Sequence, residues 1–104
     1  IMSVDYEAYY GIGAQVKLVN LKEKECPYEY ISNKLINEDR FSYFETGQRS
    51  YDSRDNGKFF IVLNNDYFDS FIQERLEELV GFINNHPDFK MIGEAGLVGG
   101  LLIS

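Results

Sequence analysis

The 104-residue sequence contains a single cysteine, a single histidine, no tryptophan and no long run of apolar residues. Because Cys26 cannot form a disulfide within the chain, we expect a reducing, cytoplasmic environment. A zinc site needs about four nitrogen or sulfur ligands, which Cys26 and His86 cannot supply in one chain. No segment approaches the ~20 apolar residues of a membrane-spanning helix, and no signal peptide is predicted. The sequence therefore predicts no zinc site and no membrane partner.

Basic residues are also few, since ten lysines and arginines stand against 17 acidic residues, for a net charge of −7. Direct binding of nucleic acid is disfavoured, because phosphate contacts need a basic face. The acidic excess is concentrated between residues 66 and 88, where six acidic residues accompany one basic residue, Arg75. A surface of this kind attracts a basic partner and repels an acidic one.

Recognisable catalytic motifs are absent as well. The glycine-rich stretches "GIG" (11–13) and "GEAGLVGG" (93–100) lack the lysine and hydroxyl residue of a phosphate-binding loop. "DSRDNG" (52–57) resembles a calcium loop, but Arg54 and Leu63 occupy two of its ligand positions. No nucleophile and base occur at a motif spacing. We therefore predict no catalytic residues, no cofactor and no metal.

What the chain does have is enough apolar material for one folded unit. Hydrophobic residues make up 44% of the sequence and aromatic residues 15%, which argues against disorder. A chain of this length is expected to form a single domain, here residues 2–104.

Strand-like alternation marks both ends of the chain. Residues 4–10 alternate apolar and polar, and the pattern resumes over residues 14–21 after a bulge or bend at Gly11 and Gly13. One kinked strand and a hairpin are both compatible with this pattern. Residues 88–94 and 96–104 also suit strands, either paired across Ala95-Gly96 or as one strand broken at its glycines.

The middle of the chain carries two helices and a hairpin. Pro27 fits the first turn of a short helix whose apolar residues are Tyr28, Ile31, Leu35 and Ile36. Residues 40–47 and 58–65 are predicted to form an antiparallel hairpin with a polar tip. Five consecutive apolar residues, Phe59 to Leu63, predict a central strand that is buried on both faces.

The longest predicted element is an amphipathic helix over residues 66–85, which Asp66 would cap and the sequence around Pro87 would end. Gly81 within it costs ~1 kcal/mol relative to alanine and suggests a close contact. In chain order these elements predict an α+β fold in which an antiparallel sheet carries one long and one short helix. A ferredoxin-like (split β-α-β) layout fits this order. An α+β domain with terminal hairpins and another strand order is the alternative.

Two groups of residues are candidates for partner binding. Glu74, Glu77 and Glu78 lie opposite the apolar stripe of the long helix, with Asp69 near its start. At the N-terminus, Asp5, Glu7 and Tyr9 point outward if the face with Tyr6 and Tyr10 points inward. Tyrosine is enriched where proteins meet proteins.

These features predict a small, acidic, non-enzymatic module that binds a basic protein surface, with an inhibitor or a mimic of nucleic-acid phosphates as one variant. In size and composition the chain is similar to many phage-encoded accessory proteins, including inhibitors of host defence. A homodimer is the alternative, in which the apolar segment 97–103 would complete the interface. A domain that binds a small molecule with tyrosine and carboxylate side chains is a third hypothesis.

Overall fold

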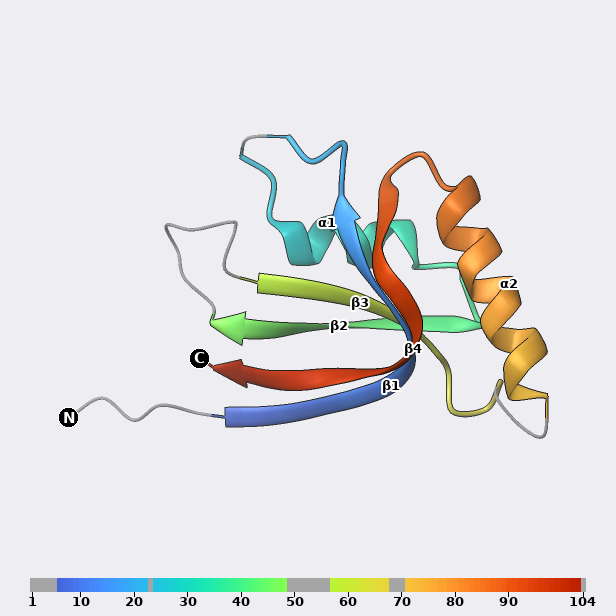
Figure 1. The fold of residues 1–104 in the computed structure, drawn as a ribbon. Coiled ribbons are helices and arrows are strands. Elements are labelled where there is room, and N and C mark those ends of the chain that lie inside the picture. The colour runs from blue at the N-terminus through green and yellow to red at the C-terminus, as the bar shows by residue number, and fades with distance from the viewer. Residues whose placement is uncertain (1–5, 23, 49–56, 68–70, 104) are drawn as a thin grey trace.

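The computed structural model describes residues 6–22, 24–48, 57–67 and 71–103 (Figure 1). Within these residues the chain forms four strands and two helices, which confirms the predicted α+β class and its order along the chain. The elements are β1 (Tyr6–Leu18), α1 (Pro27–Lys34), β2 (Phe41–Gln48), β3 (Gly57–Leu63), α2 (Ile72–Asn85) and β4 (Phe89–Ile103).

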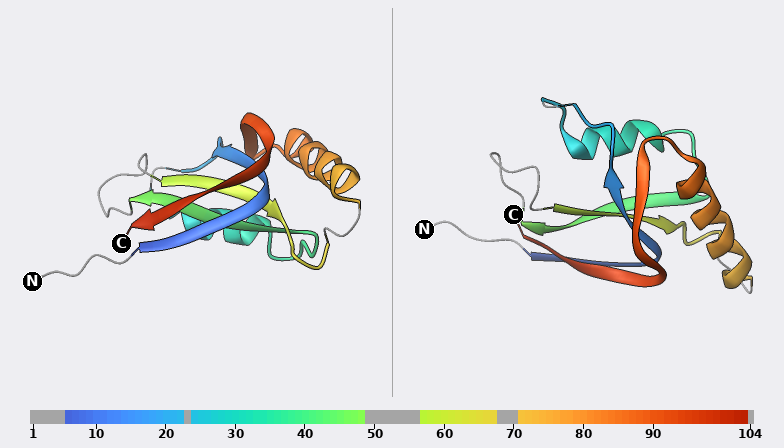
Figure 2. Two further views of the ribbon diagram at one scale, coloured as in Figure 1. Left: turned by 60° about the horizontal axis from the view of Figure 1, so that its bottom comes forward. Right: turned by 45° about the horizontal axis from the view of Figure 1, so that its top comes forward.

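The strands close into a ring in the order β1-β3-β2-β4. The β1–β3, β1–β4 and β2–β3 pairs are antiparallel, whereas β2 and β4 meet in parallel at Gly47–Leu102 and Gln48–Ile103. The sheet is therefore mixed, so the prediction of an antiparallel sheet is wrong at this junction and the ferredoxin-like layout is not confirmed. The reason is length: β1 and β4 have 13 and 15 residues, about twice β2 and β3, and their ribbon folds over to meet β2 (Figures 1 and 2).

Glycines in β1 make this fold-over possible. The β1–β4 register shifts between Gly13 and Gln15, which confirms the predicted irregularity and shows one bent strand rather than a hairpin. At Gly13 the backbone of β1 approaches β3 so closely that an added Cβ would lie 2.0 Å from the Ile61 carbonyl oxygen. Gly11 faces Val62 in the same way. No side chain other than hydrogen fits between the two strands at these points.

Strand β3 is buried on both faces, as its apolar run predicts. Phe59, Ile61 and Leu63 pack beneath the two helices, whereas Phe60 and Val62 point into the ring. The helix-side cluster also contains Ala14, Val16, Ile31, Leu35, Phe41, Leu79, Ile83 and Phe89. The ring-side cluster is smaller and adds Phe44, with Tyr9 and Val98 packed against it.

Helix α2 begins at Ile72, six residues later than predicted, and Phe71 rather than Asp66 precedes its first turn. Residues 68–70 lie outside the described part. The helix ends at Asn85 as expected, and its fully buried residues are Leu79 and Ile83. The close contact predicted for Gly81 is wrong, because no atom lies within 4 Å of a Cβ placed there.

The remaining predictions hold in part. Helix α1 begins at Pro27, but Tyr30, Ile31 and Leu35 are its buried side, and Tyr28 and Ile36 are exposed. Residues 89–103 form one strand, which settles the alternative left open for the C-terminal segment. The tip between β2 and β3 lies outside the described residues.

Candidate functional site

The predicted acidic surface of α2 is only partly available. Glu74, Glu77 and Glu78 are exposed, as expected. However, Glu78 lies 3.4 Å from the Arg75 guanidinium and also accepts a hydrogen bond from the Tyr67 hydroxyl. Glu74 and Glu77 form no ion pair within the described residues. Asp69 lies outside the described residues. Of the predicted acidic residues of α2, only Glu74 and Glu77 therefore have carboxylates that are unpaired within the described part of the chain.

The N-terminal candidates turn out differently from the prediction. The alternation in β1 is real, but its faces are reversed, because Tyr9 points into the ring and stacks on Phe44 at 5.6 Å. The Tyr9 hydroxyl donates to Glu7, which is exposed. The physical reason is that Gly11 and Gly13 lie on the same side of β1 as Tyr9. Because these glycines have no side chains, β3 can approach β1 on that side, and the ring closes there. Asp5 lies outside the described residues.

The two predicted groups are therefore not brought together. The start of β1 and helix α2 lie at opposite ends of the molecule (Figures 1 and 2).

A different surface gathers the most exposed apolar side chains of the ribbon. Tyr6, Tyr10, Leu97 and Leu101 are 64%, 72%, 78% and 51% exposed. The pairs Ala8–Leu101, Tyr10–Gly99 and Ile12–Leu97 put them on one side of β1 and β4, opposite the ring interior. We call these four residues the tyrosine–leucine face.

Gly99 shapes this face. A Cβ at Gly99 would lie 2.6 Å from the ring atom Cδ1 of Tyr10, so the ring of Tyr10 lies directly beside the backbone of β4. The described residues that share the face, which also include Ala8 and Gly99, carry no charge. The sequence indicated tyrosines in one strand and an apolar segment in the other, but it did not indicate that the two strands pair.

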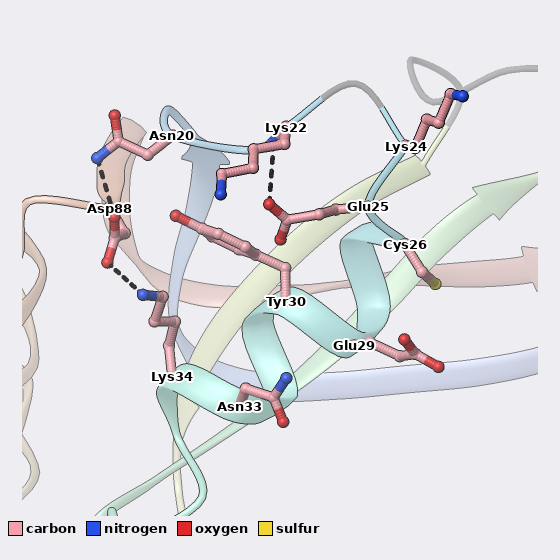
Figure 3. A pocket seen from close by; sticks show the side chains of 10 residues that line it. All are labelled: Asn20, Lys22, Lys24, Glu25, Cys26, Glu29, Tyr30, Asn33, Lys34 and Asp88. Atoms are coloured by element: carbon pink, nitrogen blue, oxygen red, sulfur yellow. Dashed lines mark hydrogen bonds and ion pairs between the residues drawn. The ribbon is translucent and has the colours of Figure 1, made fainter.

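A pocket of about 560 Å³ lies between α1 and the loops that flank it (Figure 3). Its walls come from the segment after β1, from α1 and from the turn before β4. They contain Asn20, Lys22, Lys24, Glu25, Cys26, Glu29, Tyr30, Asn33, Lys34 and Asp88. No sequence motif marks this pocket, because its residues come from three separate segments.

Asp88 holds the three segments together. Its carboxylate accepts a hydrogen bond from Asn20 at 2.9 Å and pairs with Lys34 at 3.0 Å. Its backbone N–H donates to Nδ1 of His86 at 3.1 Å, and its carbonyl accepts from Val19 at 3.1 Å. The hydrogen bonds from Asn20 and Lys34 lower the pKa of Asp88 to about 2.

This network predicts acid sensitivity. Because its pKa is depressed in the folded state, Asp88 contributes stability above pH ~4 that is lost as the pH falls toward 2. The contribution is at most about 2–3 kcal/mol, given about 1.4 kcal/mol per pH unit. We expect the unfolding free energy of Asp88→Asn to fall less between pH 5 and pH 2 than that of the wild type in urea titrations. Equal slopes would contradict the assignment.

Tyr30 is the second notable residue of the pocket. The side chain is buried, at 7% exposure, and its hydroxyl is closed to solvent and faces the Asp88 carboxylate. Burial, together with the nearby Asp88 carboxylate, raises the pKa of Tyr30 to about 12. The phenol therefore keeps its proton at neutral pH and is a hydrogen-bond donor.

The described residues form neither a metal-binding cluster nor a membrane-spanning helix. They contain no group of three or more histidine, cysteine or acidic side chains that could hold a metal ion. None of their helices is both long and apolar enough to cross a membrane. Cys26 lines the pocket as a free, exposed thiol, whereas His86 ends α2 and does not line it.

No protein-family model, no curated protein and no solved structure matches this chain.

Proposed function

We propose that this chain is a small, non-enzymatic protein-binding module that docks through the tyrosine–leucine face. The observation that supports this proposal is the gathering of four large, exposed apolar side chains on one uncharged side of the β1–β4 ribbon. Contiguous apolar patches on small proteins mark interaction sites, whereas isolated exposed apolar residues need no explanation. Tyrosine suits this role, because it combines a large contact area with one polar tip.

The negative charge has a second role in this proposal. With a net charge of −7, the chain attracts a partner whose surface around the contact is basic. Glu74 and Glu77 lie on α2, away from the tyrosine–leucine face, so they act on the encounter rather than in the final contact. Charge of this kind raises the association rate more than the affinity.

A homodimer is the second candidate, and the lack of charge on the tyrosine–leucine face favours it. Two copies that meet through this face would not bring their acidic helices together. The two tyrosines alone expose on the order of 250 Å² per copy, and a stable interface needs about 800 Å² per partner. The dimer would therefore have to include the strands around the face.

The experiment compares three proteins under identical conditions. The first is the wild type, the second carries Leu97→Asp and Leu101→Asp, and the third carries Ile36→Asp as a matched control. Ile36 is 74% exposed but follows α1 rather than lying on the ribbon. A partner captured from the cell of origin by the wild type and the control should be lost with the double variant, with Kd at least 100-fold weaker.

Charge and self-association are tested separately. Glu74→Lys with Glu77→Lys should lower the association rate about tenfold at low salt and leave dissociation unchanged. A partner that binds the Leu97/Leu101 double variant as tightly as the wild type would contradict the proposal. Sedimentation tests the alternative. If the wild type forms a homodimer, the double variant abolishes that dimer and no other partner is found, the homodimer replaces the proposed docking to a different protein.

A further inference from the structure

We propose that the partner adds an extended strand to the open edge of β1, and that this strand alternates apolar and basic side chains. The inference rests on the proposed docking through the tyrosine–leucine face and names the chemistry of the segment that docks there. It extends the contact from the side chains of that face to the backbone of β1.

The first argument is that the first half of β1 has a neighbouring strand on one side only. From Tyr6 to Leu18 the strand pairs with β4, but among the described residues it pairs with β3 only from Gly13 to Val16. In the described part of the chain, no strand therefore lies along its other edge from Tyr6 to Ile12, and Figure 1 shows this half of β1 as the outermost strand. The backbone N–H and C=O groups of such an edge can pair with a strand of another chain.

The second argument is that proline, lysine and shortness, which block many natural edge strands, are absent from this edge. Strand β1 has 13 residues and no proline, and Glu7 is its only charged residue before Gly11. Tyr6, Glu7, Ala8 and Tyr10 are all exposed. The stretch from Tyr6 to Gly11 extends about 20 Å at roughly 3.3 Å per residue, which accommodates an added strand of ordinary length.

The third argument identifies the side chains that the added strand should carry. Because neighbouring residues of a strand face opposite sides, every second side chain would lie beside Tyr6 and Tyr10, on the uncharged side that continues to Leu97 and Leu101. Apolar side chains fit there. The intervening side chains would lie on the side of Glu7, whose carboxylate is exposed and has no ion-pair partner among the described residues. Basic side chains fit there, because opposite charges across a strand pair are stabilising.

A second copy of this chain fits the edge less well than a basic strand does. Pairing of two β1 edges would put two copies of Glu7 on the same side of one sheet, and it would bring together two chains that each carry a net charge of −7. The edge therefore favours a strand from a different, basic protein.

The test titrates the isotope-labelled full chain at low salt with a short capped peptide that alternates lysine and valine. In the free protein, every second amide from Tyr6 to Ile12, the set directed away from β4, should exchange its hydrogen rapidly. Saturating peptide should slow the exchange of this set about tenfold or more. A block peptide of the same composition, in which the lysines precede the valines, should bind about tenfold more weakly or not at all.

A reversal of charge at Glu7 tests the basic half of the pattern. Glu7→Lys should weaken binding of the lysine–valine peptide about fivefold, and it should bind a peptide that alternates glutamate and valine more tightly than the wild type does. Glu77→Lys is the matched control, because it makes the same change of charge on α2, away from β1. Its effect on both peptides should be smaller. Equal effects of the two variants would show that net charge alone attracts the peptide, which would contradict the proposed pattern.

The remaining outcomes separate this inference from the proposed function. Binding that moves the amide shifts of Leu97 and Leu101 but leaves exchange in β1 unchanged would overturn strand addition and keep the docking face. Absence of binding, or equal binding of the block peptide, would also overturn it. Protection of the edge that grows with protein concentration, without peptide, would show that a second copy covers it instead. The proposed function fails by a different result, a captured partner that still binds the Leu97/Leu101 double variant.

Discussion

Replacing Gly13 with alanine is expected to destabilise the protein by at least about 3 kcal/mol, because it adds a methyl group where two backbones touch. The new Cβ would lie 2.0 Å from the carbonyl oxygen of Ile61 and 2.6 Å from the Cα of Val62. Neither atom belongs to a side chain that could turn away. Relief therefore requires β1 to separate from β3, which breaks the pairs from Gly13–Val62 to Val16–Phe59.

The matched control is alanine at Gly81, which is open to space within α2. Because glycine inside a helix costs roughly 0.5–1 kcal/mol relative to alanine, Gly81→Ala should stabilise the protein by that amount. Urea unfolding followed by circular dichroism measures both variants on one scale. Since small domains are stable by only about 5–15 kcal/mol, the Gly13 variant should unfold at much lower urea. A similar small effect at both glycines would show that β1 does not cross β3 this closely.

The elements of this fold could be predicted from the sequence wherever one segment determines its own environment. The five apolar residues of β3 indicate burial on both faces whatever their partners are, and the apolar spacing of α2 indicates a helix with one buried side. Helix α2 nevertheless begins later than its pattern suggests, since Asp66 does not cap it. Local patterns therefore indicate the type of element better than its ends.

The ring and the surfaces could not be predicted, because they depend on which strands meet. Tyr9 and Tyr10 are equivalent in the alternating pattern, and only the closure at Gly11 and Gly13 decides that Tyr9 points inward. The tyrosine–leucine face exists only because β1 pairs with β4. The pocket likewise depends on the contact of Asn20 and Lys34 with Asp88, from segments far apart in the chain.

Truncation of two adjacent residues of β3 is expected to give two large losses of stability rather than one. Phe60 points into the ring, where it stacks on Phe44 at 5.1 Å, and Ile61 is fully buried beneath the helices. Phe60→Ala should cost about 3–5 kcal/mol and Ile61→Ala about 2–5 kcal/mol, from lost burial and the cavity left behind. Leu97→Ala, at an exposed position of β4, should change stability by less than about 0.5 kcal/mol.

Neighbouring residues of a strand face opposite sides, so the pair tests each side of β3 separately. In an open sheet with one face in water, only Ile61→Ala would be costly. A loss below about 1 kcal/mol for Phe60→Ala in urea unfolding would mean that the ring interior is not packed in solution. Large losses for both variants would instead support a ring that is held closed by a second small core of Phe44, Phe60 and Val62. In that case the side of β1 and β4 opposite this core, with Tyr10 and Leu97, is left to solvent or to a partner.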